Sequence, residues 1–572
     1  MLFNLLQNFI GEISQEVLIL TEIGILIIIA TVLAFLARII KQPLIPAYIL
    51  AGILIGPLVL GLVKDPGLIS ALSQIGVAFL IFAAGLEIKL TKLKEVGKVS
   101  SVGGVLQIAL LFLIAFFITT WMGFAGYAPV YIGLVVAFSS TMIVVALLAQ
   151  KKTTNSLQGR IIIGILLVQD IAAIIALAIL SSDLSLNSVL IVLGKASVFA
   201  IVALILSKVA SPVFRKAADN HELLLLVSIS FLFLFVIGSF FAGLSLIIGA
   251  FFAGVALANS DYKTEIQGKI TPLREFFAVL FFVALGMQLK MISGNFAFLL
   301  LVLLILVVIA KPFVIMFLVR LFGYKKRTAF FTGNSLAQTS EFSLIIATLG
   351  LSLGHISQDL FSTLVLLTIV TMALTTYLIV YEKRLIGWFG WLLNFLERVK
   401  SRREELEFSD KKINKIILFG CHRMGSLILK EFEKHKEDIF VVDYNPEIIK
   451  SLMDKKIPCV YGDFMNDEVL EKANIRSAEI VISTIPDFED NLYLVRKVKK
   501  INPKADVIIV ASRISEALDL YKGGADYVIL PKVVGGEKSV DLARKIRRGK
   551  RGLKELKKEH VRYLNNLHHL LY

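Results

Sequence analysis

Asp170 is the only ionisable side chain between Ile161 and Leu180, a stretch long enough to cross a lipid bilayer as one helix. At a rise of about 1.5 Å per residue, it lies about 15 Å from Ile161, near the middle of a hydrocarbon layer roughly 30 Å thick. A carboxylate at that depth is costly unless a cation, a proton or a protein group neutralises it. We therefore predict that Asp170 belongs to an ion or proton path.

The apolar stretch 128–149 contains an island of three adjacent hydroxyl residues, Ser139, Ser140 and Thr141. Hydroxyls in a membrane helix often bond back to carbonyls of the same helix, which is the simplest interpretation of this island. They are also expected where a transporter helix is interrupted near the middle of the membrane. Taken alone, the island leaves both interpretations open.

A second, denser island interrupts the apolar stretch 327–352. It consists of Asn334, Ser335, Gln338, Thr339, Ser340 and Glu341. Two interrupted segments at matching positions of two halves indicate a transporter site at the bilayer midplane. The islands match if the membrane part contains two inverted repeats offset by seven segments, since an odd offset reverses the orientation. We expect Glu341 to bond within its own interrupted helix; a second titrating site is the alternative.

Lys311 is another candidate ionisable residue inside the membrane, with long apolar runs on both sides. A buried cation needs a partner, and Asp170 is the best anion that the sequence offers. The alternative is a lysine whose head group reaches water at the membrane surface. The apolar runs favour an ion pair between Lys311 and Asp170.

These residues lie in a strongly apolar chain of 572 residues, 57% of them hydrophobic, with a mean hydropathy of +0.80. Such values exclude a soluble globular protein and indicate a polytopic α-helical membrane protein. Thirteen segments are predicted to span the membrane, at 16–39, 43–62, 69–88, 98–121, 128–149, 159–181, 186–208, 220–239, 241–258, 274–290, 296–321, 327–352 and 361–384.

The orientation of the chain follows from its basic residues. The connections after odd-numbered segments carry Lys and Arg, whereas those after even-numbered segments are nearly free of them, with Lys64 and Lys290 as exceptions. This asymmetry predicts a protein of the cell membrane with its N-terminus outside and its C-terminal part in the cytoplasm. It also accounts for the net charge of +16 without nucleic-acid binding. The residues 1–15 lack the basic start of a signal peptide.

Beyond the membrane domain, 1–390, a charged linker at 391–412 is followed by short apolar runs that alternate with polar helical segments. Over 413–532 this alternation predicts a doubly wound parallel sheet of the Rossmann type. The remaining tail, 533–572, is strongly basic and is predicted either to lie on anionic lipid or to form a solvated helix.

The first turn of the predicted sheet reads GCHRMG. Gly420 and Gly425 occupy the outer positions of a dinucleotide fingerprint, and Asp443 ends the second strand, where an acid would bond a ribose hydroxyl. His422 stands where the fingerprint has its middle glycine, so an inert Rossmann-like module is the alternative. The predicted nucleotide site consists of Gly420, His422, Arg423, Met424, Gly425, Asp443, Asp463 and Thr484. We expect a regulatory nucleotide such as AMP or NAD(H), and no covalent cofactor.

Cys421 and Cys459 are the only cysteines, and both fall in the predicted cytoplasmic part. Thiols stay reduced there, which excludes a disulfide framework. Packing in the core is the favoured role of both residues, with a redox role as the alternative.

Together these residues resemble the cation:proton antiporter superfamily, in the branch of the bacterial glutathione-gated potassium-efflux (Kef-type) systems. The matching motifs are AYILAGILIGP at 47–57, GLE at 85–87, SST at 139–141, VQDIAAI at 168–174, FFVALGMQL at 281–289 and AQTSEFS at 337–343, followed by a domain like the RCK regulatory domains of potassium transporters.

The resemblance implies a homodimer that exposes one carboxylate alternately to each side of the membrane. Asp170 would bind a cation or a proton, with Gln169, Gln338 and the hydroxyls at 139–141 shaping the site. Electrogenic relatives, whose exchange moves net charge across the membrane, have two adjacent acids where this chain has Gln169 and Asp170. The resemblance therefore implies electroneutral exchange of one cation per proton. Lys311 would offer a substitute counter-charge for Asp170 when the site is empty during reorientation.

One departure concerns the loop ahead of the tenth segment. Gln267, Lys269 and Thr271 occupy positions that are usually acidic in the glutathione-gated systems, so gating by glutathione is not implied. Potassium/proton exchange is the leading interpretation, and sodium/proton exchange is its nearest rival. A potassium channel is disfavoured because no TVGYG-type filter segment is present. An enzyme that uses NAD is disfavoured because the cytoplasmic part offers no second substrate domain.

Overall fold

The computed structural model describes 15–63, 66–87, 97–151, 153–154, 156–182, 185–218, 220–258, 260, 262–324, 326–382, 384–385, 407–408, 415–432, 438–462, 464, 467–547, 557–558 and 560–562. The chain divides into two compact units, Met1–Ser401 and Arg402–Tyr572. Each unit is described by itself.

The first unit is helical, as the apolar segments predict. Its described helices are α2 (Gln15–Ile39), α3 (Leu44–Ile55), α4 (Pro66–Glu87), α6 (Gly97–Trp121), α7 (Ala128–Ala137), α8 (Thr141–Gln150), α9 (Leu157–Leu180), α10 (Leu186–Ala218), α11 (His221–Phe241), α12 (Leu246–Ala258), α13 (Lys263–Met287), α14 (Gly294–Ile305), the π-helical turn η1 (Leu306–Ala310), α15 (Lys311–Leu321), α16 (Lys326–Ser335), α17 (Glu341–Ser352) and α18 (Gln358–Val380). Within the described residues, nine helical segments are long and apolar enough to cross a membrane, and four shorter apolar helices accompany them.

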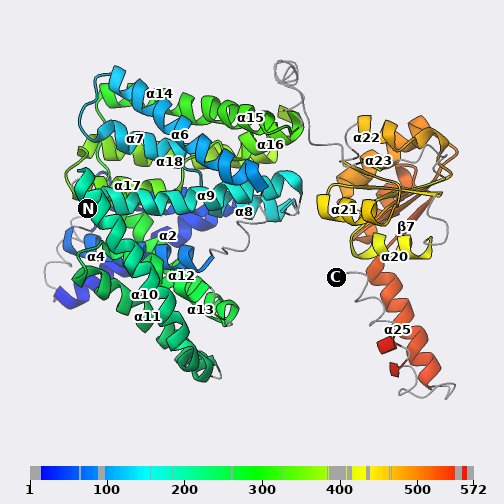
Figure 1. Cartoon of the computed structure of the whole chain (residues 1–572), viewed down its shortest axis with the longest axis horizontal. Coiled ribbons are helices and arrows are strands. Elements are labelled where there is room, and N and C mark those ends of the chain that lie inside the picture. Colours follow the sequence, from blue (N-terminus) through cyan, green and yellow to red (C-terminus); the bar gives the residue numbers. More distant parts are fainter. Residues whose placement is uncertain are drawn as a thin grey trace, which may run out of the picture. The chain divides into compact units, whose positions relative to one another are not determined.

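Both polar islands lie where a helix is broken. Between α7 and α8 the chain is extended at Phe138 and Ser140, and between α16 and α17 an unwound stretch at 336–340 ends in extended backbone at Ser340. The prediction of two interrupted segments is thus confirmed. The second half-helix α17 lies against α7, α9 and α18 (Figure 1). A hydrogen bond from Ser139 to the Leu336 carbonyl joins the two breaks.

Two helix crossings elsewhere in this unit bring backbone against backbone. A Cβ added to Gly52 of α3 would lie 2.0 Å from the Val283 carbonyl oxygen of α13, and one added to Gly286 would lie 2.1 Å from that of Ile49. Gly85 of α4 and Gly254 of α12 exclude a side chain in the same way. Only glycine permits such an approach.

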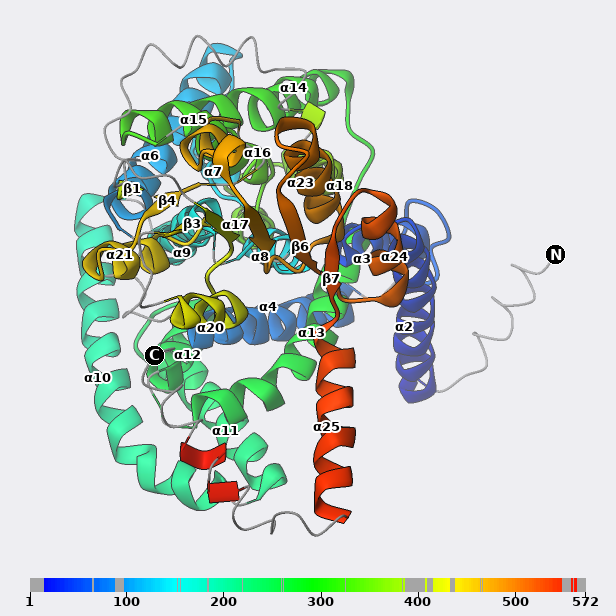
Figure 2. The ribbon, with the colours of Figure 1, turned by 90° about the vertical axis from the view of Figure 1, so that its right-hand side faces the viewer.

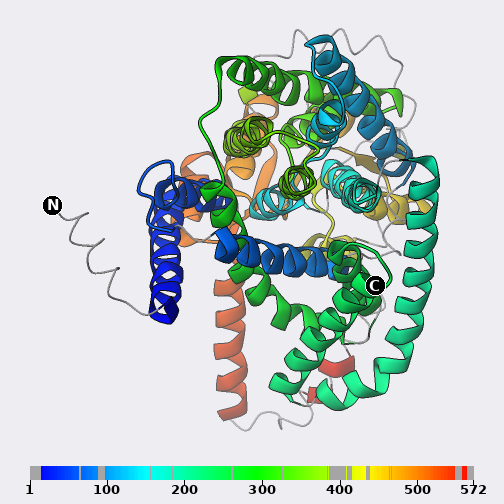
Figure 3. The same cartoon turned by 90° about the vertical axis from the view of Figure 1, so that its left-hand side faces the viewer.

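These two crossings are related by the predicted repeat. The pair α3 and α13 joins the second and tenth membrane segments, and the pair α4 and α12 joins the third and ninth. An offset of seven segments exchanges one pair for the other. In Figure 3, α4 (blue) packs against α13 (green).

The outer surface of the first unit is apolar. Large hydrophobic side chains such as Phe35 on α2, Val198 on α10 and Phe240 on α11 are more than half exposed. A soluble protein rarely exposes so many large apolar groups in one region, whereas lipid-facing helices do. The first unit is therefore the membrane part of a multi-pass protein.

The second unit contains a seven-stranded sheet with strand order β1-β4-β3-β2-β5-β6-β7 (Figure 2). The strands are β1 (Glu407–Phe408), β2 (Ile416–Phe419), β3 (Ile439–Asp443), β4 (Cys459–Tyr461), β5 (Ile480–Ser483), β6 (Asp506–Val510) and β7 (Tyr527–Ile529). The helices are α20 (Arg423–Glu431), α21 (Pro446–Asp454), α22 (Asp467–Lys472), η4 (Ile475–Ser477), α23 (Phe488–Ile501), α24 (Ile514–Lys522) and α25 (Pro531–Arg547).

The predicted Rossmann-like fold is confirmed by this order. The strands β2 to β7 pair in parallel, with Leu418 of β2 opposite Val441 of β3 on one side and Ile482 of β5 on the other. Because helices cover both faces of a parallel sheet, its strands are apolar throughout. One strand was not predicted: β1 lies inside the expected linker and pairs antiparallel with β4 at the edge of the sheet.

Candidate functional site

Asp170 belongs to α9, and its side chain lies beside the first residue of the half-helix α8. The hydroxyl of Thr141, the first residue of α8, lies 3.0 Å from both carboxylate oxygens of Asp170 and donates its proton to them. Asp170 is partly buried, and among the described residues Thr141 alone hydrogen-bonds its carboxylate. No cationic side chain of the described residues pairs with it.

Gln169 connects α9 to the first break. Its side-chain oxygen accepts the backbone N–H of Ser139 at 2.8 Å, and the Ser139 hydroxyl donates to the carbonyl of Leu336 in the second break at 3.0 Å. Gln169 and Ser139 are both buried. The hydrogen bond from Ser139 to Leu336 therefore joins the two unwound segments directly. Asp170, the residue after Gln169, lies beside them.

Lys311 is fully buried where the two broken helices cross, but it is not paired with Asp170. Its ammonium donates to the carbonyls of Val136, Phe138 and Gln338 at 2.8, 2.7 and 2.7 Å. These bonds use all three of its protons. The predicted ion pair is thus wrong in this structure, because the carbonyl ends of α7 and of the α16 break already supply the compensating negative charge.

The backbone around Lys311 is specialised to place it there. The π-helical turn η1 precedes it, and the Lys311 N–H bonds to the carbonyl of Leu306, five residues back. Pro312 follows and has no N–H to give, which removes one bond of an ordinary α-helix. Single π-helical turns are frequent at functional sites.

Glu341 lies at the N-terminal ends of the half-helices α8 and α17, on the other side of the breaks from the carbonyls that bind Lys311. It is the first residue of α17, and its carboxylate faces the Ser140 hydroxyl and the backbone N–H of Met142, in the first turn of α8. The positive N-terminal ends of two half-helices thus meet an acidic side chain, while their negative counterparts meet Lys311. These two partners belong to the other interrupted helix, so the expectation that Glu341 bonds within its own interrupted helix does not describe these contacts.

Sequence reasoning missed the threonines of α18. Thr371 accepts the N–H of Thr339 at 3.3 Å, and Thr375 donates to the carbonyl of Ala337 at 3.2 Å. Thr368 accepts the Thr339 hydroxyl at 2.9 Å. The spacing of Thr368, Thr371 and Thr375 places them on one helix face, which was visible in the sequence. They satisfy backbone groups that unwinding would otherwise leave unpaired inside the protein.

Several buried polar atoms near the crossing have no hydrogen-bond partner among the described residues. They include both side-chain polar atoms of Gln338, Nε2 of Gln169 and Oε2 of Glu341. Gln107 of α6, which was not predicted, gives its Nε2 to the Ala137 carbonyl at 3.4 Å and keeps an unpartnered Oε1. Unpartnered buried polar atoms indicate water or ions. The oxygens in this set are of the kind that alkali cations bind.

Glu87, at the end of α4, forms an ion pair with Arg274 of α13. The distance between its Oε1 and the Arg274 guanidinium is 2.8 Å, and the Glu87 side chain is 46% exposed. The pair joins the end of α4 to α13.

The glycine turn of the second unit follows the fingerprint geometry. Gly420 has φ +83°, a left-handed conformation, and a Cβ on Gly425 would lie 2.0 Å from the Gly420 carbonyl oxygen. Thr484 donates its hydroxyl to that same carbonyl at 2.8 Å. His422 occupies the N-cap position of α20 without a capping hydrogen bond from its side chain, and the helix begins with Arg423 and Met424. Asp463 lies outside the described residues.

Asp443 is occupied by the turn itself. Its two carboxylate oxygens accept the backbone N–H of Cys421 at 2.6 Å and of Asn445 at 2.7 Å. Burial raises the pKa of Asp443, while these N–H groups and His422 oppose the rise. Burial and the charge of Asp443 raise the pKa of Cys421 to about 12. Cys421 and Cys459 are both buried free thiols, in agreement with a packing role.

Comparisons with known proteins agree with both units. The family model "Sodium/hydrogen exchanger, transmembrane" matches residues 25–380, and the TrkA-N domain model matches 416–531. The "Putative cation/proton antiporter YbaL" of Escherichia coli K12 is 28% identical over 90% of this chain and 95% of its own length. The "Glutathione-regulated potassium-efflux system protein KefC" of Cronobacter sakazakii is 29% identical over 83% of this chain and 77% of its own.

One solved structure shares the fold of the membrane part. The sodium proton antiporter MjNhaP1 of Methanocaldococcus jannaschii is similar with a TM-score of 0.52 and 16% identity, over 67% of this chain and all of that one. The resemblance to Kef-type antiporters with an RCK-like domain is thereby confirmed. This chain belongs to the sodium/hydrogen exchanger family, with a TrkA-N domain after its membrane part.

Proposed function

We propose that this protein exchanges potassium for protons across the membrane by alternating access to Asp170. The observation that carries this proposal is the position of the Asp170 carboxylate, bonded to Thr141 at the start of a half-helix and to no cationic side chain among the described residues. A carboxylate inside the membrane needs a positive partner on each crossing. A proton or a metal cation supplies it.

Competition makes the exchange obligatory. A proton on Asp170 removes the negative charge that holds a cation, and a bound cation displaces the proton. The Thr141 hydroxyl can donate to the ionised carboxylate or turn an oxygen lone pair toward a bound cation. The side-chain oxygens of Gln338 and Gln107, which have no partner among the described residues, are candidates for completing the cation's shell.

The neighbourhood of Asp170 supports an electroneutral cycle. Gln169 is neutral, and its side chain is engaged with Ser139. Lys311 spends its charge on three helix-end carbonyls, so it stays in place whether Asp170 is charged or not. One titrating carboxylate therefore exchanges one monovalent cation for one proton. The counter-charge role expected for Lys311 gives way to a role in holding the crossing.

Potassium is favoured by the relatives, one of which is named a potassium-efflux system protein. Sodium is the alternative, because a neighbour with the same fold is named a sodium proton antiporter. We further propose a homodimer in the cell membrane with its N-terminus outside and the second unit in the cytoplasm, where a nucleotide such as AMP or NAD(H) at the Gly420–Gly425 turn regulates exchange.

The proposal is tested with the purified full-length chain in lipid vesicles that contain a pH-sensitive dye. An outward or inward gradient of potassium or sodium is imposed, and proton movement and net current are recorded. Cation-driven proton movement without net current is expected, and it should be lost in Asp170→Asn. Asp359→Asn, in the first turn of α18, is the matched control and should behave as wild type.

Retained exchange in Asp170→Asn would remove Asp170 from the mechanism. A potassium current without proton coupling would instead identify a channel. A response to sodium with none to potassium would replace the proposed cation and leave the mechanism in place.

A further inference from the structure

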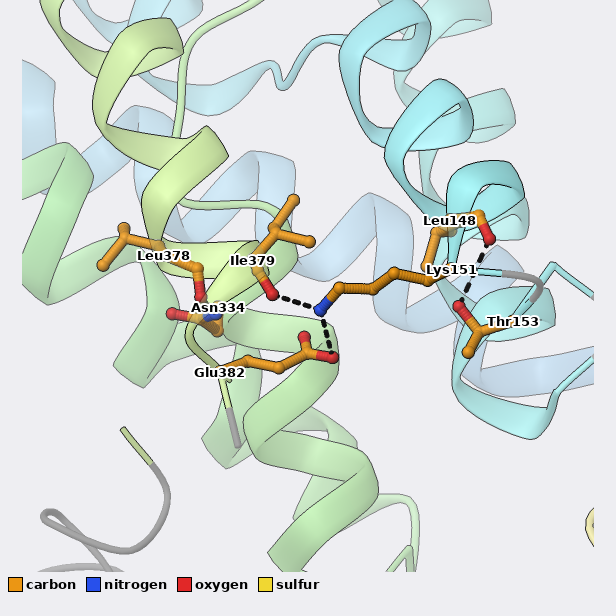
Figure 4. Close-up of polar contacts among 7 residues, drawn as sticks. All are labelled: Leu148, Lys151, Thr153, Asn334, Leu378, Ile379 and Glu382. Carbon is orange, nitrogen blue, oxygen red and sulfur yellow. Dashed lines mark hydrogen bonds and ion pairs between the residues drawn. The ribbon is translucent and has the colours of Figure 1, made fainter. Parts of the chain in front are cut away.

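The two half-helices that lead to the breaks are both tied to the last turn of α18 (Figure 4). Lys151, which caps α8, donates to the carbonyl of Ile379 and to Glu382 Oε1, the latter at 2.8 Å. Asn334, near the end of α16, donates to the carbonyl of Leu378 at 2.8 Å. We call the contacts of Lys151, Asn334, Leu378, Ile379 and Glu382 the α18 clamp.

Helix physics explains why donors gather at this turn. The last carbonyls of a helix have no partner within it and carry partial negative charge, so a lysine there is favourable. The side chains of Lys151 and Glu382 are only 26% and 11% exposed, which reduces screening by water and salt. The clamp is thus stronger than an ion pair on an open surface.

A short stiff element connects Lys151 to the ion site. The half-helix α8 runs from Thr141 to Gln150, about 15 Å at 1.5 Å per residue. At its far end Thr141 holds Asp170, and beyond its near end Thr153 bonds back to the Leu148 carbonyl through its N–H at 2.9 Å and its hydroxyl at 3.4 Å. A displacement of Lys151 is therefore transmitted along α8 to the contact between Thr141 and Asp170, because no loop lies between them.

The second half-helix gives an equally short path. Asn334 is followed by one helical residue and then by the unwound stretch 336–340, whose carbonyl at Gln338 is bonded to Lys311. The last turn of α18 thus contacts both half-helices, α8 and α16, through one side chain each. The chain passes from this same turn to the linker and the second unit.

We propose that the α18 clamp is the joint through which the second unit controls exchange. This inference rests on the regulation included in the proposed function. A regulator shifts a transporter between states only if some contact differs between those states. A clamp formed in one state and open in the other supplies that contact, because it biases the positions of both half-helices at once.

The test compares exchange rates of full-length variants in vesicles, with and without AMP or NADH on the side of the second unit. Lys151→Gln and Glu382→Gln each remove one charge, and the double variant Lys151→Glu/Glu382→Lys restores an ion pair in reverse. Lys195→Gln is the matched control, because Lys195 also donates to a helix-end carbonyl, that of Ala242 at 3.0 Å, but on the exposed surface. Elution as a single species in size-exclusion chromatography verifies folding.

In the wild type and in Lys195→Gln, nucleotide should change the rate. In the single clamp variants, the ratio of the exchange rates with and without nucleotide should move toward one by at least about fivefold, which corresponds to loss of a typical coupling free energy. The apparent KM for the cation should stay within about twofold of wild type. The reversed pair should recover part of the response.

Other results separate the possible failures. An undiminished nucleotide response in both single variants would overturn the clamp and leave the proposed function standing. A changed KM with an intact response would assign Lys151 to shaping the site and would also overturn the inference. A wild type that exchanges ions but ignores both nucleotides would overturn the proposed regulation, and the inference with it.

Discussion

The hydroxyl of Thr141 lies 3.0 Å from both carboxylate oxygens of Asp170, and these two residues come from different helices. Thr141 is also the first residue of the half-helix α8, so one side chain joins the proposed ion-binding carboxylate to a helix end. Any movement of α8 along its axis changes this contact. The pair is thus the place where helix position and ion binding meet.

Replacing Thr141 by Val keeps the shape of the side chain but removes the hydroxyl. A hydrogen bond to a charged group contributes about 1.5–3 kcal/mol, so the apparent KM for the cation should rise by at least about tenfold. The measurement is cation-dependent proton movement in vesicles. Thr141→Ser keeps the hydroxyl and should stay near wild type; equal KM values for Val and wild type would contradict a role of this contact in binding.

Replacing Lys311 by Met should destabilise the fold, because three buried carbonyls lose their donor. An unsatisfied buried group costs about 1–3 kcal/mol, which should lower the Tm of the detergent-purified protein clearly. Lys195→Met, at an exposed carbonyl, should change it little.

A double-mutant cycle with Asp170→Asn distinguishes this role of Lys311 from an ion pair. If Lys311 neutralised Asp170, removing both charges would lower the stability of the fold much less than the sum of the two single changes. From the observed geometry we expect the two effects on stability to be nearly additive, with a coupling free energy below about 0.5 kcal/mol. A large coupling would restore the pairing predicted from the sequence.

Replacing Asp443 by Ala should weaken nucleotide binding at least about tenfold, since both the ribose acceptor and the acceptor for the Cys421 N–H are lost. Calorimetric titration of the full-length protein with AMP or NADH measures this. Asp519→Ala, an exposed residue of α24, is the control. Unchanged affinity would place the nucleotide away from the turn or leave the domain without one.

Cys421 should resist alkylation in the folded protein. With its pKa raised to about 12, the thiolate fraction at pH 8 is on the order of 10⁻⁴, far below that of a free cysteine. Mass spectrometry after N-ethylmaleimide treatment should find Cys421 unmodified, and modified once the protein is unfolded in denaturant. Rapid modification of the native protein would favour the redox interpretation.

The stability of the second unit should fall in mild acid. Burial raises the pKa of Asp526, but the Lys499 ammonium at 2.6 Å and the Val507 N–H outweigh it and hold the pKa below its usual value. A lowered pKa in the folded state stabilises the fold above the pKa of the unfolded chain, and this contribution is lost as pH falls through the folded value.

The matched variant for this pH dependence is Asp526→Asn. It should be less stable than wild type at pH 7 by no more than about 1 kcal/mol, since the pair is partly exposed, and the difference should shrink between about pH 5 and pH 3. Thermal unfolding at a series of pH values measures it. A difference that grows in acid would have the wrong sign for this ion pair.

The sequence was sufficient to predict the breaks but not what holds them. Six polar residues within 334–341 are incompatible with a continuous lipid-facing helix, so an interruption there could be predicted. The partners of Lys311 could not, because they are backbone carbonyls that become available only where two breaks cross. Charge pairing between side chains, which is what a sequence displays, led to Asp170 instead.

The second unit shows the same division. Long apolar runs such as 439–443 identify their strands without further information. The strand β1 has only two residues and forms because β4 offers an unpaired edge, so nothing local in 407–408 indicates it. Asp443 was predicted from its place at a strand end, while its bond to Cys421 depends on how closely the glycine turn folds back.

The glycine crossings follow the predicted repeat and set how closely their helices approach. Gly52 and Gly254, like Gly85 and Gly286, occupy equivalent places in the two repeats, and at each of them an added carbon would strike main-chain atoms of the opposing helix. A side chain at any of the four would push the paired helices apart, because the opposing atoms are main chain and cannot move aside. Each crossing therefore fixes the distance between its two helices, whatever residues stand around it.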